Sequence, residues 1–414
     1  MLSIQFIREN SQAVKKAMQN RLSDAPIDLI LELDEKRRFQ TSCIDDLRRR
    51  RKEIAKEGTA SAIEEGRVLR DELKTLEDEV RQTEETLDNL LLQVPNMPDI
   101  SAPVGQSEDD NIVTYTALEH MPKFGFAPKK HWDIGEALDI IDFERGVKLS
   151  GTRFYVLKGA GAALQRALIN FFLDKHIRAH GYKEIFPPFM VHKECAYSSG
   201  NLPKFADNLY HDAEEDYWFV PTAEMPLTNL HRNEVLTLEQ LPINYTAHTS
   251  CFRREKMSAG KETRGIKRGH QFEKVEMYKF CTPETSFEEL DRILADGEAV
   301  IKDLKLPYRI KSICTADMGF CSTRSFDLEI YAAGQDEWLE VSSCSNCKDF
   351  QARRANIRFK RDGESKPEYV HTLNGSGLAL PRVIIAILEN YQQVNGTVLV
   401  PEVLQPYMNT DIIS

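Results

Sequence analysis

Apolar residues recur at alternating steps of four and three along residues 69–94. The run consists of Leu69, Leu73, Leu76, Val80, Thr83, Leu87, Leu90 and Val94. This spacing is a heptad seam with one polar member, and it predicts a long helix that packs against a partner along a narrow stripe. An earlier run, over residues 27–57, has similar but broken spacing, with Arg37, Gln40 and Arg51 at positions of its seam. Two long helices are therefore expected.

The segment between the two runs, residues 58–61, has the sequence Gly-Thr-Ala-Ser. Gly58 can end the first helix, and a small hydroxyl side chain can cap the second. Two helices of similar length joined by a short turn predict an antiparallel coiled-coil hairpin over residues 27–94, about 45 Å long at roughly 1.5 Å per residue and projecting from the rest of the protein. The alternative is a coiled coil between two chains, which is the commoner use of heptads. The short turn favours pairing within one chain.

The character of the sequence changes after the second run. Proline, glycine and acidic residues without periodicity fill residues 97–114, which predicts a linker. The linker separates a helical N-terminal domain, residues 1–96, from a larger domain, residues 115–414. In the larger domain the pattern predicts helices over residues 162–180 and 381–391, and strands at residues 218–220, 275–280, 328–331 and 338–341. The predicted fold class is α+β.

Composition narrows the class of protein. With 414 residues and 41% hydrophobic content, the chain suits two or three domains with substantial cores. It has no run of about 18 apolar residues, and its start, MLSIQFIREN, lacks the features of a secretory signal, so we expect a cytoplasmic protein without a membrane span. The net charge of −11 argues weakly against a non-specific coat on nucleic acid, although a local basic patch can still bind phosphates.

Eight cysteines are scattered through the chain. Without a secretory signal, they favour reduced thiols over a disulfide framework. Cys344 and Cys347 form a CxxC pair, but no second CxxC and no histidine pair follows at the usual zinc spacing. We therefore expect thiols in the core or near a site, and no structural zinc.

A basic cluster lies near the end of the first predicted helix. It consists of Arg48, Arg49, Arg50, Arg51 and Lys52. Five successive residues ring a helix, so they cannot all face the seam. One interpretation is a solvated helix surface with acidic neighbours, and the other is a patch that grips phosphates. Charge alone leaves both interpretations open.

Three groups of residues in the larger domain have the composition of ligand sites. The first has the sequence FRRE at residues 252–255, followed by a basic loop and by HQFEKVEM at residues 270–277. The loop carries Lys256, Lys261, Arg264, Lys267 and Arg268. This pattern predicts a strand, a long loop and an antiparallel strand, in which an arginine at a strand end can clamp a phosphate or a carboxylate with two hydrogen bonds. An ion-paired hairpin without a ligand is the alternative.

The second and third groups lie towards the C-terminus. The second, NGSGLALPR at residues 374–382, is a glycine-rich turn into a helix with Arg382 in its first turn. It is neither a phosphate loop nor a dinucleotide motif, because GxxxxGK(S/T) and GxGxxG are both absent from the sequence. The third, EVSS at residues 340–343, is at a strand end. Alternation would place Glu340 and Ser342 on one face, suited to Mg²⁺ bound with a nucleotide, and a polar strand edge is the alternative.

Together these groups resemble motifs 2 and 3 of the class II aminoacyl-tRNA synthetases. Finer matches narrow the resemblance to the seryl-tRNA synthetase family: TAE at residues 222–224, FRRE, EVSS, and NGSG followed by PR. The resemblance spans nearly the whole chain, including the N-terminal helices. It implies a class II catalytic domain, an antiparallel sheet flanked by helices, beside the coiled-coil hairpin. It also implies an enzyme that activates L-serine with ATP and charges tRNA(Ser), with the selenocysteine tRNA as a second candidate substrate.

The resemblance implies roles for individual residues. The serine substrate would contact Thr222, Ala223, Glu224, Glu276, Asn374 and Ser376. ATP would contact Arg253, Arg254, Glu255, Phe272, Glu340, Val341, Ser342, Ser343 and Arg382. The catalytic residues would be Arg253, which bridges the serine carboxylate and the α-phosphate, and Arg382, which binds the γ-phosphate. The adenine would meet Glu255 and Phe272, and the Mg²⁺ that accompanies ATP would be held by Glu340 and Ser343.

For the hairpin, the resemblance favours phosphate binding by the basic cluster, residues 48–52, because family members hold tRNA by its long variable arm. It also implies a homodimer through motif 1, at about residues 165–188. Two residues depart from the usual family pattern: Arg254, where a small residue is common, and Pro381, where glycine is common. The alternative functions are an arm-bearing paralogue that binds RNA without aminoacylation and a ligase that loads amino acids onto a carrier protein.

Overall fold

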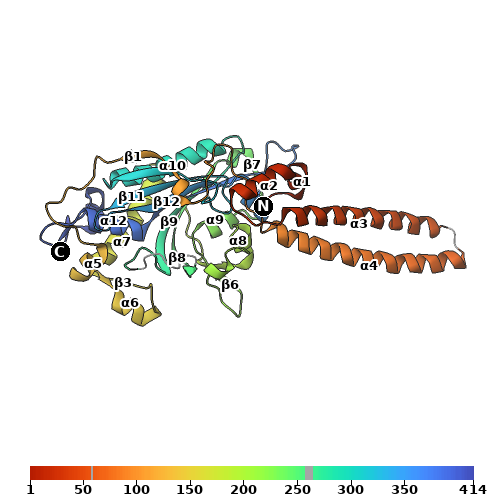
Figure 1. Ribbon diagram of the computed structural model, residues 1–414, viewed down its shortest axis with the longest axis horizontal. Helices are drawn as coiled ribbons and strands as arrows, with labels where there is room; N and C mark the ends of the chain where they lie inside the picture. Colours follow the sequence, from red (N-terminus) through yellow and green to blue (C-terminus); the bar gives the residue numbers. More distant parts are fainter. Residues whose placement is uncertain (57–58, 257–263) are drawn as a thin grey trace. The chain divides into compact units, whose positions relative to one another are not determined.

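The computed structural model describes residues 1–56, 59–256 and 264–414 (Figure 1). The chain divides into two compact units, Met1–Met97 and Pro98–Ser414. The predicted helix end at Gly58 and the predicted loop residue Lys261 lie outside the described residues. No helix in the described ranges is both long enough and apolar enough to cross a membrane.

The first unit is built from helices. They are α1 (Ile4–Glu9), α2 (Ser11–Asn20), α3 (Ile27–Ile54) and α4 (Ala60–Leu91). Helices α3 and α4 lie side by side and form the predicted coiled-coil hairpin (Figure 1). Thr59 caps α4, because its side chain accepts a hydrogen bond from the Ala62 backbone N–H at 3.1 Å. A short hydroxyl side chain therefore starts the second helix, as the sequence predicts.

The seam of the hairpin combines apolar and polar levels. Its buried apolar residues include Ile44, Leu69, Leu73 and Leu87. Gln40, also buried, donates from Nε2 to Glu79 Oε2 at 3.1 Å and accepts from the Thr83 hydroxyl at 3.3 Å. Gln40 of the first predicted seam and Thr83 of the second therefore meet at one level, where such a pair fixes the register of a coiled coil at some cost in stability. Arg51, in contrast, is exposed, because a charged side chain at this position is more stable in water.

The second unit is built around one large sheet. In the described part of the chain it has eight strands, in the order β1 (Ile112–Ala117), β10 (Tyr308–Ser312), β11 (Arg324–Ala332), β12 (Glu337–Asn346), β15 (His371–Ala379), β9 (Gln271–Cys281), β8 (Ile243–Phe252) and β4 (Lys183–Glu184). Neighbouring strands are antiparallel, except that β4 pairs in parallel with β8. Strand β1 begins at Ile112, so the end of the segment predicted as a linker belongs to the sheet. The β-branched residues Ile112 and Val113 favour a strand, which the acidic residues just before them obscure.

Three helices cover the sheet with apolar side chains. They are α7 (Gly159–Arg178), α10 (Ser286–Asp303) and α12 (Leu380–Asn390). Leu168, Ile301 and Ile384, one from each helix, are buried in a single apolar cluster with Leu328 and Val341 of the sheet. Complete burial of each such side chain contributes about 1.5–3 kcal/mol. The predicted fold class, α+β with an antiparallel sheet flanked by helices, is confirmed.

The remaining elements are short. They are α5 (His131–Ala137), α6 (Phe143–Ser150), α8 (Lys193–Ser198), α9 (Glu224–Asn229), α11 (Phe350–Ala355), α13 (Gln405–Met408), β2 (Ile141–Asp142), β3 (Val156–Leu157), β5 (Met190–His192), β6 (Tyr217–Phe219), β7 (Val235–Thr237), β13 (Arg358–Lys360), β14 (Glu368–Tyr369), β16 (Val398–Leu399) and β17 (Ile412–Ile413). Helix α9 contacts β9, and α11 contacts β15. These contacts bring polar side chains of both helices to the sheet.

Candidate active site

The strand pair β8–β9 carries the first group of candidate residues. FRRE begins at the last residue of β8, and Phe272 lies opposite Cys251 in the register of the pair. Arg253 Nε donates to the Pro221 carbonyl at 3.2 Å, and the guanidinium lies over the Phe272 ring at 5.1 Å from its centroid. A hydrogen bond and a cation–π contact therefore fix the orientation of Arg253.

A polar cluster lies on one face of β9. Strand alternation puts Lys274 and Glu276 on this face and Met277 in an apolar cluster on the other. The Thr222 hydroxyl donates to Glu276 Oε2 at 2.6 Å, and Lys274 Nζ donates to Thr222 Oγ1 at 2.7 Å and pairs with Glu276. Sequence reasoning missed Lys274. Its position two residues before Glu276, on the same face of a strand, is the signal that could have found it.

Glu224 stands beside this polar cluster. Its Oε1 accepts from Gln351 Nε2 at 2.6 Å and from Asn374 Nδ2 at 3.2 Å. Burial, reinforced by the negative charge of Glu276, raises the pKa of Glu224 to about 7. Ser376 lies directly opposite Glu276 in the pairing of β15 with β9. The structure therefore brings together five of the six residues predicted for serine, and adds Gln351, which sequence reasoning missed. The five are Thr222, Glu224, Glu276, Asn374 and Ser376.

A bulge in β12 decides which residues of EVSS share a face. Val341 is the extra residue in the pairing of β12 with β11. The bulge puts Ser343 on the face of Glu340, while the Ser342 hydroxyl donates to the Ser376 carbonyl at 2.6 Å. The expectation that Glu340 and Ser342 share a face is wrong, because simple alternation does not anticipate a bulge.

The face of Glu340 and Ser343 also carries Asp327, which lies opposite Ser343 on β11. Among the described residues, the buried Asp327 Oδ1 has no hydrogen-bond partner. Burial and then the charge of Glu340 raise the pKa of Asp327 well above its ordinary value, although a hydrogen bond with Ser343 opposes the shift. Carboxylate and hydroxyl oxygens are the ligands that Mg²⁺ prefers. These residues therefore fit a divalent cation.

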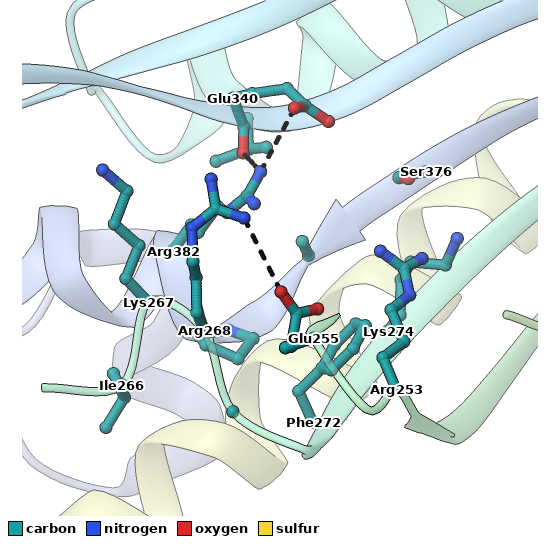
Figure 2. Close-up of a pocket in the computed structure, with 14 residues that line it drawn as sticks. Arg253, Glu255, Ile266, Lys267, Arg268, Phe272, Lys274, Glu340, Ser376 and Arg382 are labelled. Carbon is teal, nitrogen blue, oxygen red and sulfur yellow. Dashed lines mark hydrogen bonds and ion pairs between the residues drawn. The ribbon is translucent and has the colours of Figure 1, made fainter. Parts of the chain in front are cut away.

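A pocket of about 260 Å³ adjoins these groups (Figure 2). Its cationic lining residues are Arg253, Lys267, Arg268, Lys274 and Arg382. Arg268 pairs with Glu255, with an NH1–Oε2 distance of 3.6 Å, and Arg382 pairs with Glu340, with an NH1–Oε2 distance of 3.4 Å, as the dashed lines of Figure 2 mark. Phe272 supplies an aromatic wall. The chemistry of this lining suits a polyanion that carries a planar ring.

Two of the candidate ligands lie differently from the rest. The Arg254 guanidinium lies over the Tyr210 ring at 5.0 Å, and Ala223 is fully buried in an apolar cluster.

Pro381 lines the pocket at the start of α12. The thiol of Cys347 lies 3.6 Å from Asn374 Nδ2, beside the polar cluster, and burial raises its pKa.

The basic cluster of the first unit lies on α3 and forms ion pairs. Arg48 pairs with Glu77 at 2.8 Å, Arg49 with Asp46 at 2.9 Å, and Arg50 with Glu65 at 2.6 Å. The exposed fractions of these three arginine side chains are 56%, 72% and 63%. Acidic neighbours are therefore present, as one of the two interpretations expects. The pairs remain exposed, and exposed pairs contribute only about 0–1 kcal/mol each, so a phosphate could replace the carboxylates.

Comparisons with known proteins extend over both units. The family model described as the seryl-tRNA synthetase N-terminal domain matches residues 1–98, and the tRNA synthetase class II core domain (G, H, P, S and T) matches residues 205–391. A serine–tRNA ligase of Dehalococcoides mccartyi is 63% identical over 413 residues, which cover 100% of both chains.

Two solved structures are similar over the whole length. The crystal structure of seryl-tRNA synthetase from Pyrococcus horikoshii complexed with ATP has a TM-score of 0.95 at 37% identity, covering 100% of this chain and 99% of that one. The cytoplasmic serine-tRNA ligase from Naegleria fowleri in complex with AMP has a TM-score of 0.90 at 32% identity, with the same coverage. Full-length identity and fold agree, so the chain belongs to the seryl-tRNA synthetase family of class II aminoacyl-tRNA synthetases.

Proposed function

We propose that this chain is a serine–tRNA ligase. It forms seryl-adenylate and pyrophosphate from L-serine and ATP. It then transfers the seryl group to a hydroxyl at the 3′ end of tRNA(Ser), where an ester bond forms as the bond to the phosphate breaks and AMP leaves. One observation carries the proposal: the polar cluster around Thr222, Glu224 and Glu276 adjoins a cationic pocket with an aromatic wall. The names of the full-length relatives support the same function.

Serine binds in the polar cluster. Glu224 and Glu276 hold the substrate's ammonium and hydroxyl groups together with Thr222, and Asn374 and Ser376 complete the pocket. Alanine is rejected because the buried partners of the hydroxyl would stay unpaired. Threonine has the hydroxyl, so it is excluded by the lack of room for its additional methyl group.

The first reaction brings two anions together. A serine carboxylate oxygen attacks the α-phosphorus, a new P–O bond forms, and the bond to the bridging oxygen breaks as pyrophosphate leaves with that electron pair. Arg253 neutralises and aligns the carboxylate and the α-phosphate, while Arg382 holds the γ-phosphate of the leaving group. Positioning and charge neutralisation supply the catalysis, and no nucleophile from the protein takes part.

The remaining ATP contacts follow from the pocket lining. Phe272 stacks on the adenine, which Glu255 also meets. Glu340 and Ser343 hold Mg²⁺ with ATP, and the unpaired Asp327 oxygen beside them supports this placement. When bound, the ion stabilises the negative charge on the phosphate oxygens. Arg382, which also pairs with Glu340, binds the γ-phosphate.

We assign residues 1–96 to tRNA binding and the unit with the large sheet, which includes β1 from Ile112 onward, to catalysis. We also propose a cytoplasmic homodimer that forms through residues 165–188, where Phe186 has an exposed fraction of 80%. The selenocysteine tRNA is proposed as a second substrate of the same enzyme.

Replacing Arg48, Arg49, Arg50 and Arg51 with alanine should lower the charging of tRNA(Ser) by about 10- to 100-fold, because phosphate contacts are lost. Serine-dependent exchange of pyrophosphate into ATP should stay unchanged, since it does not need tRNA. The salt dependence of tRNA binding should also become shallower.

The matched control replaces Arg67, Arg70 and Arg81 of α4, which are similarly exposed and also paired with acidic residues. If the control variant loses as much charging activity, or if the arm variant loses exchange too, the basic cluster is not the tRNA contact.

The whole proposal is tested by charging a tRNA(Ser) transcript with radiolabelled serine. We expect acid-precipitable seryl-tRNA that depends on ATP and Mg²⁺. Serine activation without charging of tRNA would favour a ligase that loads a carrier protein. RNA binding without serine activation would favour the non-catalytic paralogue.

A further inference from the structure

A buried histidine, His131, lies next to residues 266–268, which line one side of the pocket. His131, the first residue of α5, and Glu389 of α12 both have an exposed side-chain fraction of 0%. The His131 Nδ1 and the Glu389 Oε1 are 2.9 Å apart, and the His131 backbone N–H donates to the same oxygen at 2.9 Å. His131 is therefore attached to the helix whose first turn carries Arg382.

The other ring nitrogen of His131 binds the segment of residues 266–268, which lines one side of the pocket. The Ile266 backbone N–H donates to His131 Nε2 at 3.2 Å. An acceptor nitrogen carries no proton, so the single ring proton of the neutral imidazole lies on Nδ1 and is donated to Glu389. Ile266, Lys267 and Arg268 all line the pocket (Figure 2). The imidazole thus links the Glu389 carboxylate of α12 to Ile266, the first of these three lining residues.

Gly265 shows how closely the chain approaches the ring. Its φ of +81° lies in the left-handed region, and a Cβ at this residue would lie 2.0 Å from His131 Nε2 and 3.0 Å from the Trp132 ring. Only glycine fits such a conformation and such an approach. The backbone at Gly265 is therefore fitted to the imidazole independently of the Ile266 hydrogen bond.

The carboxylate that holds the ring is itself fixed. Besides the two His131 donors, Glu389 accepts from the Gln335 backbone N–H at 2.9 Å and from Gln335 Nε2 at 3.1 Å. Four N–H donors, two from His131 at the start of α5 and two from Gln335 between β11 and β12, thus surround one buried carboxylate. Such a network holds its members in one geometry.

We propose that His131 is a positioning residue for ATP. Clamped by Glu389, it fixes the backbone at Ile266 and so brings Lys267 and Arg268 to the phosphates. This inference rests on the proposed binding of ATP in the pocket. It predicts that loss of the imidazole weakens ATP binding while the serine cluster, on β9 and β15, keeps its affinity.

The test compares the variant His131→Phe, which keeps a ring and loses both hydrogen bonds, with the unmodified protein. The dissociation constant of a non-hydrolysable ATP analogue, measured by calorimetry, should rise about tenfold, because the buried Ile266 N–H loses its acceptor. The KM for ATP in pyrophosphate exchange should rise to the same extent, and the KM for serine should change by less than about twofold.

The matched control is Gln392→Leu. Gln392, two residues beyond α12 and also buried, accepts from the Lys129 N–H at 2.8 Å. It donates to the backbone carbonyls of Lys129 and Glu389 at 2.9 and 2.8 Å, and none of its hydrogen bonds within the described residues involves residues 266–268. It should lower the melting temperature without weakening ATP binding. If the two variants weaken the binding of the ATP analogue equally, or if His131→Phe changes only the melting temperature, His131 has a merely structural role.

A second pair of variants keeps the inference testable if His131→Phe does not fold. Gly265→Ala should also raise the dissociation constant of the ATP analogue. Combined with His131→Ala, its effect should be smaller than the product of the two separate factors, because removal of the ring relieves the contact with the new Cβ. Multiplicative effects would overturn the proposal. Calorimetry with the ATP analogue does not require serine activation, so failure of this inference is distinguishable from failure of the proposed function.

Discussion

Replacing Arg253 with lysine should lower the kcat/KM of serine-dependent pyrophosphate exchange by about a thousandfold, although the positive charge is kept. Arg253 is oriented by its Nε–H donation to Pro221 and by its contact with the Phe272 ring. A lysine ammonium has no planar fork, so it cannot bridge the serine carboxylate and the α-phosphate in the same way. Because the bridge is strongest when both anions approach, most of the loss should fall on kcat.

The control for this variant is Arg353→Lys. The Arg353 guanidinium also lies over an aromatic ring, that of Tyr369 at 4.6 Å, but it pairs with Asp349, the residue just before α11, outside the pocket. Its exchange activity should stay within about threefold of that of the unmodified protein, since Arg353 does not line the pocket and lysine keeps the positive charge that pairs with Asp349. A loss of less than tenfold in Arg253→Lys, or an equal loss in the control, would contradict the role of Arg253.

Replacing Glu224 with glutamine should raise the KM for serine by about a hundredfold, because a charge-assisted hydrogen bond to the substrate ammonium is lost. The unmodified protein should also show a pH dependence. With its pKa raised to about 7, Glu224 is protonated at lower pH, and only the ionised carboxylate attracts an ammonium group. The KM for serine should therefore rise as the pH falls below about 7, and approach a constant value above it.

This pH dependence is measured from initial exchange rates at saturating ATP, across the range on both sides of pH 7. In Glu224→Gln the rise at low pH should disappear, because no carboxylate remains to titrate. The variant Glu288→Gln, at an exposed residue of α10, should keep the profile of the unmodified protein. A KM for serine that does not change between acidic and neutral pH would show that Glu224 does not hold the ammonium.

The parts of the fold that depend on local patterns are predictable from the sequence. Heptad spacing places α3 and α4, and it marks Gln40 and Thr83 as polar members of the two seams. Prediction of a side chain's orientation fails where pairing with a neighbouring strand overrides the local pattern. The bulge at Val341 turns Ser342 away from Glu340, because pairing between neighbouring strands, which the sequence does not reveal, decides where an extra residue is accommodated.

The candidate site is also predictable only in part. The motifs name the residues from which the site is built, but not the partners that hold them. Gln351 lies 127 residues from Glu224, and Lys274 donates to Thr222 across 52 residues of sequence. Such partners are found only when the fold brings distant segments together. The link from Glu389 through His131 to Ile266 is of the same kind, because each member comes from a different part of the chain.

The most direct test of serine activation is pyrophosphate exchange into ATP, measured with each of the common amino acids and without tRNA. Serine should support exchange, with alanine and threonine at least about a hundredfold lower in kcat/KM. Alanine would leave the partners of the hydroxyl unpaired, and threonine would not fit. The absence of exchange with serine, or equal exchange with alanine, would contradict the assignment of the Thr222, Glu224 and Glu276 cluster as a serine site.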